Sequence, residues 1–271
     1  MPSSLSSRAL DPFVQNRGSR RRWLLFTLAF LLIAATFPAS MTKGVFAATE
    51  SDATIAMRLA DLLRSARTVI SLNQDLINDP TMGDKGLTGE KVLADAIALH
   101  KDRTGEDPRD SDASTLEGKL LRAQMDSIAA VVDENQPTIN AKGVGFKGFI
   151  PAVFARLVNE KFTETVGDQA TIKVTAPENL VRNRRARPDA WETGVIENEF
   201  LKPDWPIGQP FSELVQVNGK PAFRILVPEY YAPSCLSCHG EPAGEVDITG
   251  YPKEGGKEGE LGAAISVILF K

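Results

Sequence analysis

The stretch FSELVQVNGKPAFRILV, residues 211–227, decides the fold class of this chain. Two apolar-rich runs, residues 211–217 and 222–227, flank the pair Asn218-Gly219. An Asn-Gly pair between two such runs favours a tight primed turn, because both residues of that turn need a positive φ. The stretch therefore predicts an antiparallel β-hairpin.

Further strands are predicted before and after the hairpin, and helices are predicted ahead of them. Residues 171–175 (TIKVT) alternate as a strand, and residues 261–270 have the composition of a closing strand. Apolar side chains recur at helical spacing in residues 52–76, 90–101 and 150–162, and in a segment that follows a Ser114-Thr115-Leu116-Glu117 capping box and ends near Pro137. Helices followed by an antiparallel sheet predict a single α+β domain.

One glycine-rich motif has the form of a nucleotide-binding loop. Residues 143–148, GVGFKG, match G-x-G-x-x-G and open a helix. The nucleotide fingerprint requires a strand before the loop, whereas here the preceding segment is predicted to be helical. We therefore interpret the motif as a turn between two helices.

Residues 1–47 are typical of an export signal. Arginines at positions 17 and 20–22 precede the apolar run 23–37, and Val45-Phe46-Ala47 supplies small residues before a cleavage point at Ala48. An uncleaved membrane anchor is the alternative, although Pro38 interrupts the run. Both interpretations place the folded domain, residues 48–271, outside the cytoplasm, in the periplasm or beyond. We expect membrane contact only through this segment, if it is uncleaved.

The mature chain is expected to be acidic. Residues 1–47 hold six of the 31 basic residues and one of the 35 acidic residues, which leaves 25 basic and 34 acidic residues and a formal charge of −9. Such a balance argues against nucleic acid as a partner. It would suit a basic protein partner.

The pentapeptide Cys235-Leu236-Ser237-Cys238-His239 has the spacing of a c-type haem attachment site. Two thiols three positions apart can bond to two vinyl groups of one haem, and the adjacent histidine can bind its iron. A disulfide, a redox-active pair or half of a zinc site are the alternatives. Zinc would need more ligands, and Pro233, Pro242 and Gly244 indicate a loop setting, unlike a thioredoxin motif. A simple disulfide stays open, but it gives no reason for the adjacent histidine.

Four stretches carry a resemblance to a known family. They are residues 76–87, residues 143–153 (GVGFKGFIPAV), Arg182-Asn183 with residues 188–192 (PDAWE), and residues 235–240. With these, the chain resembles the haem-binding proteins typified by cyanobacterial c-type members, once classed as a domain of unknown function. In that family the stretch between Asn183 and Pro188 often carries proline and asparagine, whereas this chain has arginines at 184, 185 and 187. The resemblance implies a PAS-like fold, a common sensory module, with one covalent haem c.

Within this site, Cys235 and Cys238 are expected to form the two thioethers and His239 to be the proximal iron ligand. The other ring nitrogen of His239 needs an acceptor, and a backbone carbonyl near Glu241-Pro242 is the predicted one. Tyr230 and Tyr231 are predicted to pack against the ring or in the core. Four arginines are candidate partners of haem propionates, with a solvated basic loop as the alternative: Arg182, Arg184, Arg185 and Arg187.

The sixth iron ligand is left open by the sequence. His100 and Met82 are the candidates, with water or a gas in an open position as the alternative. A surface histidine is the other interpretation of His100, and Met57 and Met125 are expected to be core residues.

We therefore expect an exported mono-haem protein that transfers electrons or senses redox state, with an unidentified redox or signalling protein as partner. A gas- or ligand-binding sensor with an open or labile sixth position is the alternative. A haem enzyme would need distal acid–base residues, and the chain has only one histidine outside the motif. We therefore predict no catalytic residues and no enzymatic activity.

Overall fold

The hairpin predicted from residues 211–227 is present in the computed structural model, which describes residues 50–271. Strand β2 (Phe211–Val217) pairs antiparallel with β3 (Lys220–Tyr230). Asn218 and Gly219 connect the two strands with φ angles of 52° and 78°. Both values are positive, as a primed two-residue turn requires, so this prediction is confirmed.

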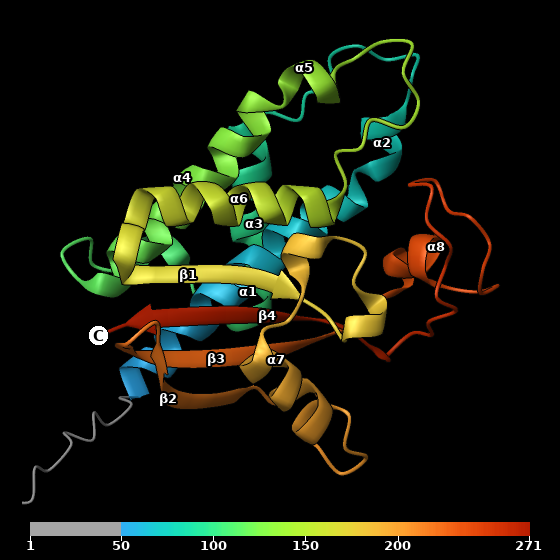
Figure 1. Cartoon of the computed structure of the whole chain (residues 1–271). Helices are drawn as coiled ribbons and strands as arrows, with labels where there is room; N and C mark the ends of the chain where they lie inside the picture. Colours follow the sequence, from blue (N-terminus) through green and yellow to red (C-terminus); the bar gives the residue numbers. More distant parts are fainter. Residues whose placement is uncertain (1–49) are drawn as a thin grey trace, which may run out of the picture. The chain divides into compact units, whose positions relative to one another are not determined.

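A four-stranded antiparallel sheet is built around this hairpin, in the order β1-β4-β3-β2 (Figure 1). The last strand of the chain, β4 (Leu261–Phe270), lies between β3 and β1 (Ala170–Thr175). Val267 of β4 has Ile172 on one side and Ile225 on the other. Together with the helices, this sheet confirms the predicted α+β class, and it is compatible with a PAS-like domain.

Four long helices precede or lead into the sheet. They are α1 (Glu50–Leu72), α3 (Gly89–Thr104), α4 (Leu116–Glu134) and α6 (Pro151–Val166). Short elements connect them: α2 (Gln74–Asn78), α5 (Gln136–Ile139) and the 3-10 turns Pro108–Asp110 and Gly167–Gln169. In the second half, 3-10 turns span Glu178–Leu180 and Arg184–Ala186, and α7 (Ala190–Val195) continues into the π-helical turn Ile196–Phe200.

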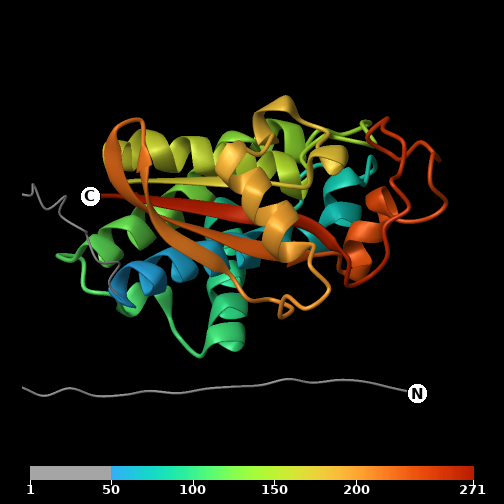
Figure 2. The same ribbon diagram turned by 60° about the horizontal axis from the view of Figure 1, so that its bottom comes forward.

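The long helices pack against one face of the sheet through a large apolar core (Figures 1 and 2). On β3, Phe223, Ile225 and Val227 alternate toward this core, because successive side chains of a strand point to opposite faces. Leu59, Phe154 and Phe162 are among the fully buried side chains that meet them from the helices.

The opposite face of the sheet is covered by α7 and the π-helical turn. Leu226 of β3 and Ala264 of β4 contribute to a smaller apolar cluster here, with Val195, Ile196 and Phe200. Arg224, two residues before Leu226 on β3, lies on the same face of the strand. Its guanidinium lies 4.3 Å over the Trp191 ring and 3.2 Å from a carboxylate oxygen of Glu192. Because β3 is covered on both faces, its burial is nearly continuous.

Several helix boundaries differ from the prediction, since the helices predicted over 52–76, 90–101 and 150–162 are Glu50–Leu72, Gly89–Thr104 and Pro151–Val166. Two of the differences have a local cause. The helix predicted over 52–76 ends at Leu72, because the Asn73 side chain donates to the carbonyl of Val69 and the chain restarts as α2. The cap of α4 is Thr115 rather than Ser114, and its hydroxyl accepts from the Gly118 amide at 3.1 Å. The amide of Ser114 instead donates to Asp112, in a turn that delays the helix by one residue.

The glycine-rich motif 143–148 lies between α5 and α6 with no strand before it, as the interpretation as a helix-to-helix turn predicts. The export segment 1–47 and its cleavage point lie outside the described residues. Within residues 50–271, no helix combines the length and the apolar character needed to cross a membrane.

Candidate haem-attachment site

The CxxCH pentapeptide forms a helical turn beyond the end of β3. A 3-10 turn, Pro233–Cys235, runs directly into the short helix α8 (Leu236–His239), and the Gly240 amide closes the turn on the Leu236 carbonyl at 2.9 Å. Figure 1 shows α8 outside the sheet, next to the loop that follows it. The predicted loop setting is therefore wrong. Because residues three apart on a helix share a face, the turn brings Cys235 and Cys238 to the same side.

Both cysteines are free thiols and half-buried. Burial raises the pKa of the Cys238 thiol, which the Ser237 hydroxyl approaches at 3.8 Å. A raised pKa keeps this thiol protonated at neutral pH.

His239 is held by a carboxylate on one nitrogen and is open on the other. Nδ1 lies 2.9 Å from Oε2 of Glu254, and the side chain is 31% exposed. In the part of the chain that the structure describes, Nε2 has no hydrogen-bond partner. The predicted acceptor, a carbonyl near Glu241-Pro242, is therefore wrong. No motif in the sequence pointed to Glu254, which lies 15 residues away in a glycine-rich loop.

The aromatic ring of Tyr231 packs against His239. The two rings stack with centroids 5.3 Å apart and an interplanar angle of 22°. Burial raises the pKa of Tyr231 to about 12. A Cβ atom on Gly256 or Gly262 would lie 2.5 or 2.4 Å from the Tyr231 ring, so these two glycines let the ring sit flat against the backbone. Tyr230 lies apart from this stack, and its hydroxyl accepts from the Gly208 amide at 3.2 Å.

Arg182 connects the carboxylate to the backbone of the turn. It reaches both oxygens of Glu254, with Nε at 2.7 Å from one and Nη2 at 2.9 Å from the other. Nη2 also donates to the Cys238 carbonyl at 2.8 Å, and Nη1 donates to Asp247 at 2.7 Å. Of the four arginines proposed as propionate partners, Arg182 is thus already engaged by carboxylates. The other three are exposed, and Arg185 pairs with Glu160 at 2.8 Å.

The two carboxylates around Arg182 are ionised. Burial tends to raise the pKa of Asp247, but hydrogen bonds from Thr249, Arg182 and Tyr251 outweigh it and hold the pKa well below its usual range. For Glu254, burial is likewise outweighed by hydrogen bonds from Arg182 and His239, which lower its pKa. The site therefore presents an anionic acceptor to His239.

The two candidates for the sixth ligand lie in other surroundings. His100 is fully buried, so its interpretation as a surface histidine is wrong. Both of its ring nitrogens are unpaired within the described residues, and burial lowers its pKa, with Asp61, Arg58 and Arg103 as the charged neighbours. Met82 is 42% exposed in the loop between α2 and α3. No hydrogen bond, ion pair or ring contact in residues 50–271 joins either of them to residues 235–239.

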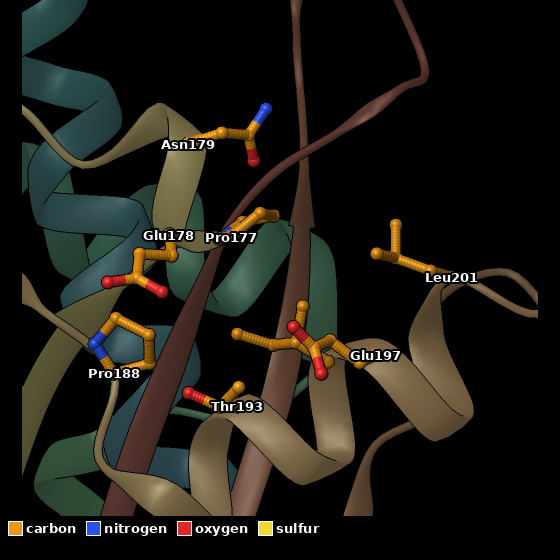
Figure 3. Close-up of a pocket in the computed structure, with 8 residues that line it drawn as sticks. Pro177, Glu178, Asn179, Pro188, Thr193, Glu197 and Leu201 are labelled. Carbon is orange, nitrogen blue, oxygen red and sulfur yellow. The ribbon is translucent and has the colours of Figure 1, made fainter.

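A hollow of about 410 Å³ lies beside α7 and the π-helical turn (Figure 3). Pro177, Glu178 and Asn179 line one side of it, and Thr193 and Glu197 line the other. The segment that supplies the first three residues goes on to Arg182 and thus to the turn. The lining contains none of residues 235–239. Across residues 50–271, no cluster of three or more His, Cys, Asp or Glu side chains is arranged to hold a metal ion.

The family model described as Tll0287-like (Tll0287) matches residues 109–269, which include the CxxCH turn and the sheet up to the penultimate residue of β4. No curated protein and no solved structure matches the chain.

Proposed function

The chain belongs to the Tll0287-like family, and on that premise we propose that it is an exported mono-haem c-type protein that transfers electrons or senses redox state. Cys235 and Cys238 would hold one haem c through thioethers, and His239 would bind its iron. The observation that carries the proposal is that the two ring nitrogens of His239 differ: Nδ1 is hydrogen-bonded to Glu254, and Nε2 is open. A histidine that binds a metal usually donates its second ring N–H to a carboxylate, carbonyl or water in this way.

The side chains of the CxxCH turn are chemically suited to hold a haem. Both thiols are free and share one side of the turn, next to a histidine that is partly accessible. The zinc alternative would need about four ligands, and the disulfide alternative would leave the carboxylate-bound His239 without a role. A bound haem would supply a one-electron iron couple and, if its sixth position is open, a site for small ligands.

Cys235 and Cys238 would supply the two thiols for attachment to the two vinyl groups of a haem. Each sulfur would bond to a vinyl carbon, with its S–H hydrogen passing to the neighbouring vinyl carbon, so that the addition balances. No oxidant is needed, but both cysteines must be reduced when the bond forms. Because an oxidising compartment favours the disulfide, attachment has to precede or reverse pairing.

The proposed setting follows from the sequence. Residues 1–47 would direct the chain out of the cytoplasm, and the charge of −9 on the remaining chain would favour a redox or signalling partner with a basic surface. We propose no enzymatic activity and no nucleic-acid partner.

The test is to produce the full chain in cells with intact cytochrome maturation and to record its absorption spectrum and intact mass. We expect one haem that stays attached after denaturation, and a Cys235→Ala/Cys238→Ala variant that carries none. Carbon monoxide then separates the two functions. If carbon monoxide leaves the absorption spectrum of the reduced protein unchanged, electron transfer is supported. If carbon monoxide shifts that spectrum, a ligand sensor is supported.

A further inference from the structure

We propose that Glu254, clamped by Arg182, is a positioning residue that fixes the tautomer of His239 and makes its Nε2 a strongly donating iron ligand. The inference rests on the proposed function, because it concerns the same haem. From it we expect a low reduction potential of the bound haem, which cannot be predicted from the CxxCH spacing.

The tautomer follows from the hydrogen bond to Glu254. Both oxygens of Glu254 accept hydrogen bonds from the Arg182 guanidinium, so Nδ1 of His239, 2.9 Å from Oε2, is the donor in its contact with this carboxylate. In the neutral imidazole, Nε2 then carries the lone pair. Stacking on Tyr231 at 5.3 Å fixes the plane of the ring. The imidazole is therefore oriented and protonated as an iron ligand before any haem is bound.

The position of the carboxylate follows from Arg182. The guanidinium binds both oxygens of Glu254 at 2.7 and 2.9 Å, and it also binds the Cys238 carbonyl at 2.8 Å. His239, Glu254, Arg182 and the Cys238 carbonyl thus form a closed ring of contacts. Asp247, which has no exposed side-chain surface, binds the remaining arm of the guanidinium. A planar fork with fixed donors suits this role, which a lysine could not fill.

The consequence is electronic. A charged acceptor on Nδ1 raises the basicity of the histidine more than a neutral carbonyl would. A more basic ligand stabilises oxidised iron relative to reduced iron, and hydrogen bonds to the axial ligand are one of the means by which a protein sets the potential. We therefore expect Glu254 to lower the reduction potential of the bound haem.

The first test compares the holoprotein with Glu254→Gln. This variant keeps the size of the side chain and removes its charge. At a fixed applied potential we expect the ratio of reduced to oxidised protein to rise about tenfold or more, which is ~59 mV for one electron. The matched control is Glu245→Gln, which removes a carboxylate from the same loop that pairs with Lys253 at 3.3 Å and does not touch His239. A shift that is absent, or equal in both variants, would overturn the inference.

A second test needs neither a substitution nor a haem. The ¹⁵N chemical shifts of the full chain made without haem report the histidine tautomers, and the chain has only two histidines. We expect His239 to carry its proton on Nδ1, and a predominant Nε2–H form would contradict the inference. A wild-type protein that never takes up haem would instead refute the proposed function and leave this result intact.

Discussion

Gly262 packs directly against the Tyr231 ring that stacks on His239, and adding one methyl group at Gly262 tests this packing. In Gly262→Ala the new Cβ would lie 2.4 Å from the Tyr231 ring, so the ring or the strand must move. We expect a loss of about 1–3 kcal/mol in the free energy of unfolding, measured by urea denaturation. Gly194→Ala is the control, because its Cβ meets no atom within 4 Å and alanine favours a helix by up to about 1 kcal/mol. Equal losses in the two variants would contradict this account.

His100 gives a prediction about pH. Burial lowers its pKa in the folded chain, with Asp61 opposing this and Arg58 and Arg103 adding to it. The unfolded chain, with a histidine pKa of about 6.5, therefore binds more protons below that pH, and stability falls as the pH drops from 7 to 5. We expect His100→Leu to flatten this part of the stability profile and, since it removes two unpaired buried nitrogens, to raise stability at pH 5.

The same variant tests His100 as the sixth ligand. Because no hydrogen bond, ion pair or ring contact within residues 50–271 joins His100 to the CxxCH turn, we expect the haem spectrum of His100→Leu to match that of the wild type. An altered spectrum would restore His100 as a ligand. A stability profile as steep as that of the wild type would show that His100 is not the group that titrates.

At this scale, the sequence could identify Cys235, Cys238 and His239 because their roles depend on spacing along the chain. Glu254 and its link to Arg182 could not be found in this way. The contact between them spans 72 residues and forms only in the folded chain. The burial of His100 was missed for a similar reason, since it depends on how α1 and α3 pack.

At the scale of elements, the start of α4 is set by one hydroxyl. Thr115 accepts from the Gly118 amide, whereas Ser114 is exposed one residue ahead of the cap. We expect Thr115→Ala to lower the free energy of unfolding by about 0.5–2 kcal/mol and Ser114→Ala to leave it nearly unchanged, both measured by urea denaturation. The opposite order of the two variants would show that the helix begins one residue earlier.

Most helices and strands could be predicted from local sequence patterns, and the wrong helix boundaries have local causes. The hairpin was predictable because Asn218-Gly219 suits one turn type and the runs beside it are strand-like. The break at Asn73 and the shift from Ser114 to Thr115 arise where short polar side chains bond to the backbone and compete with helical hydrogen bonds. Such competition depends on geometry that apolar periodicity does not report.

At the scale of the whole molecule, the α+β class followed from the order of helices and strands. The strand order β1-β4-β3-β2 did not, because β1 and β4 pair in a register that places Ile172 opposite Val267, 95 residues further along the chain. The hollow beside α7 was also unpredictable, since residues 177–188 and the π-helical turn meet only in the folded chain.

The central claim is that this domain carries one haem bound through Cys235 and Cys238. The most direct measurement is the intact mass of the denatured full chain, purified from cells with cytochrome maturation and recorded with its absorption spectrum. We expect a coloured protein heavier than its polypeptide by one haem, and an uncoloured Cys235→Ala/Cys238→Ala variant. A colourless wild-type protein with the mass of the polypeptide alone would contradict it.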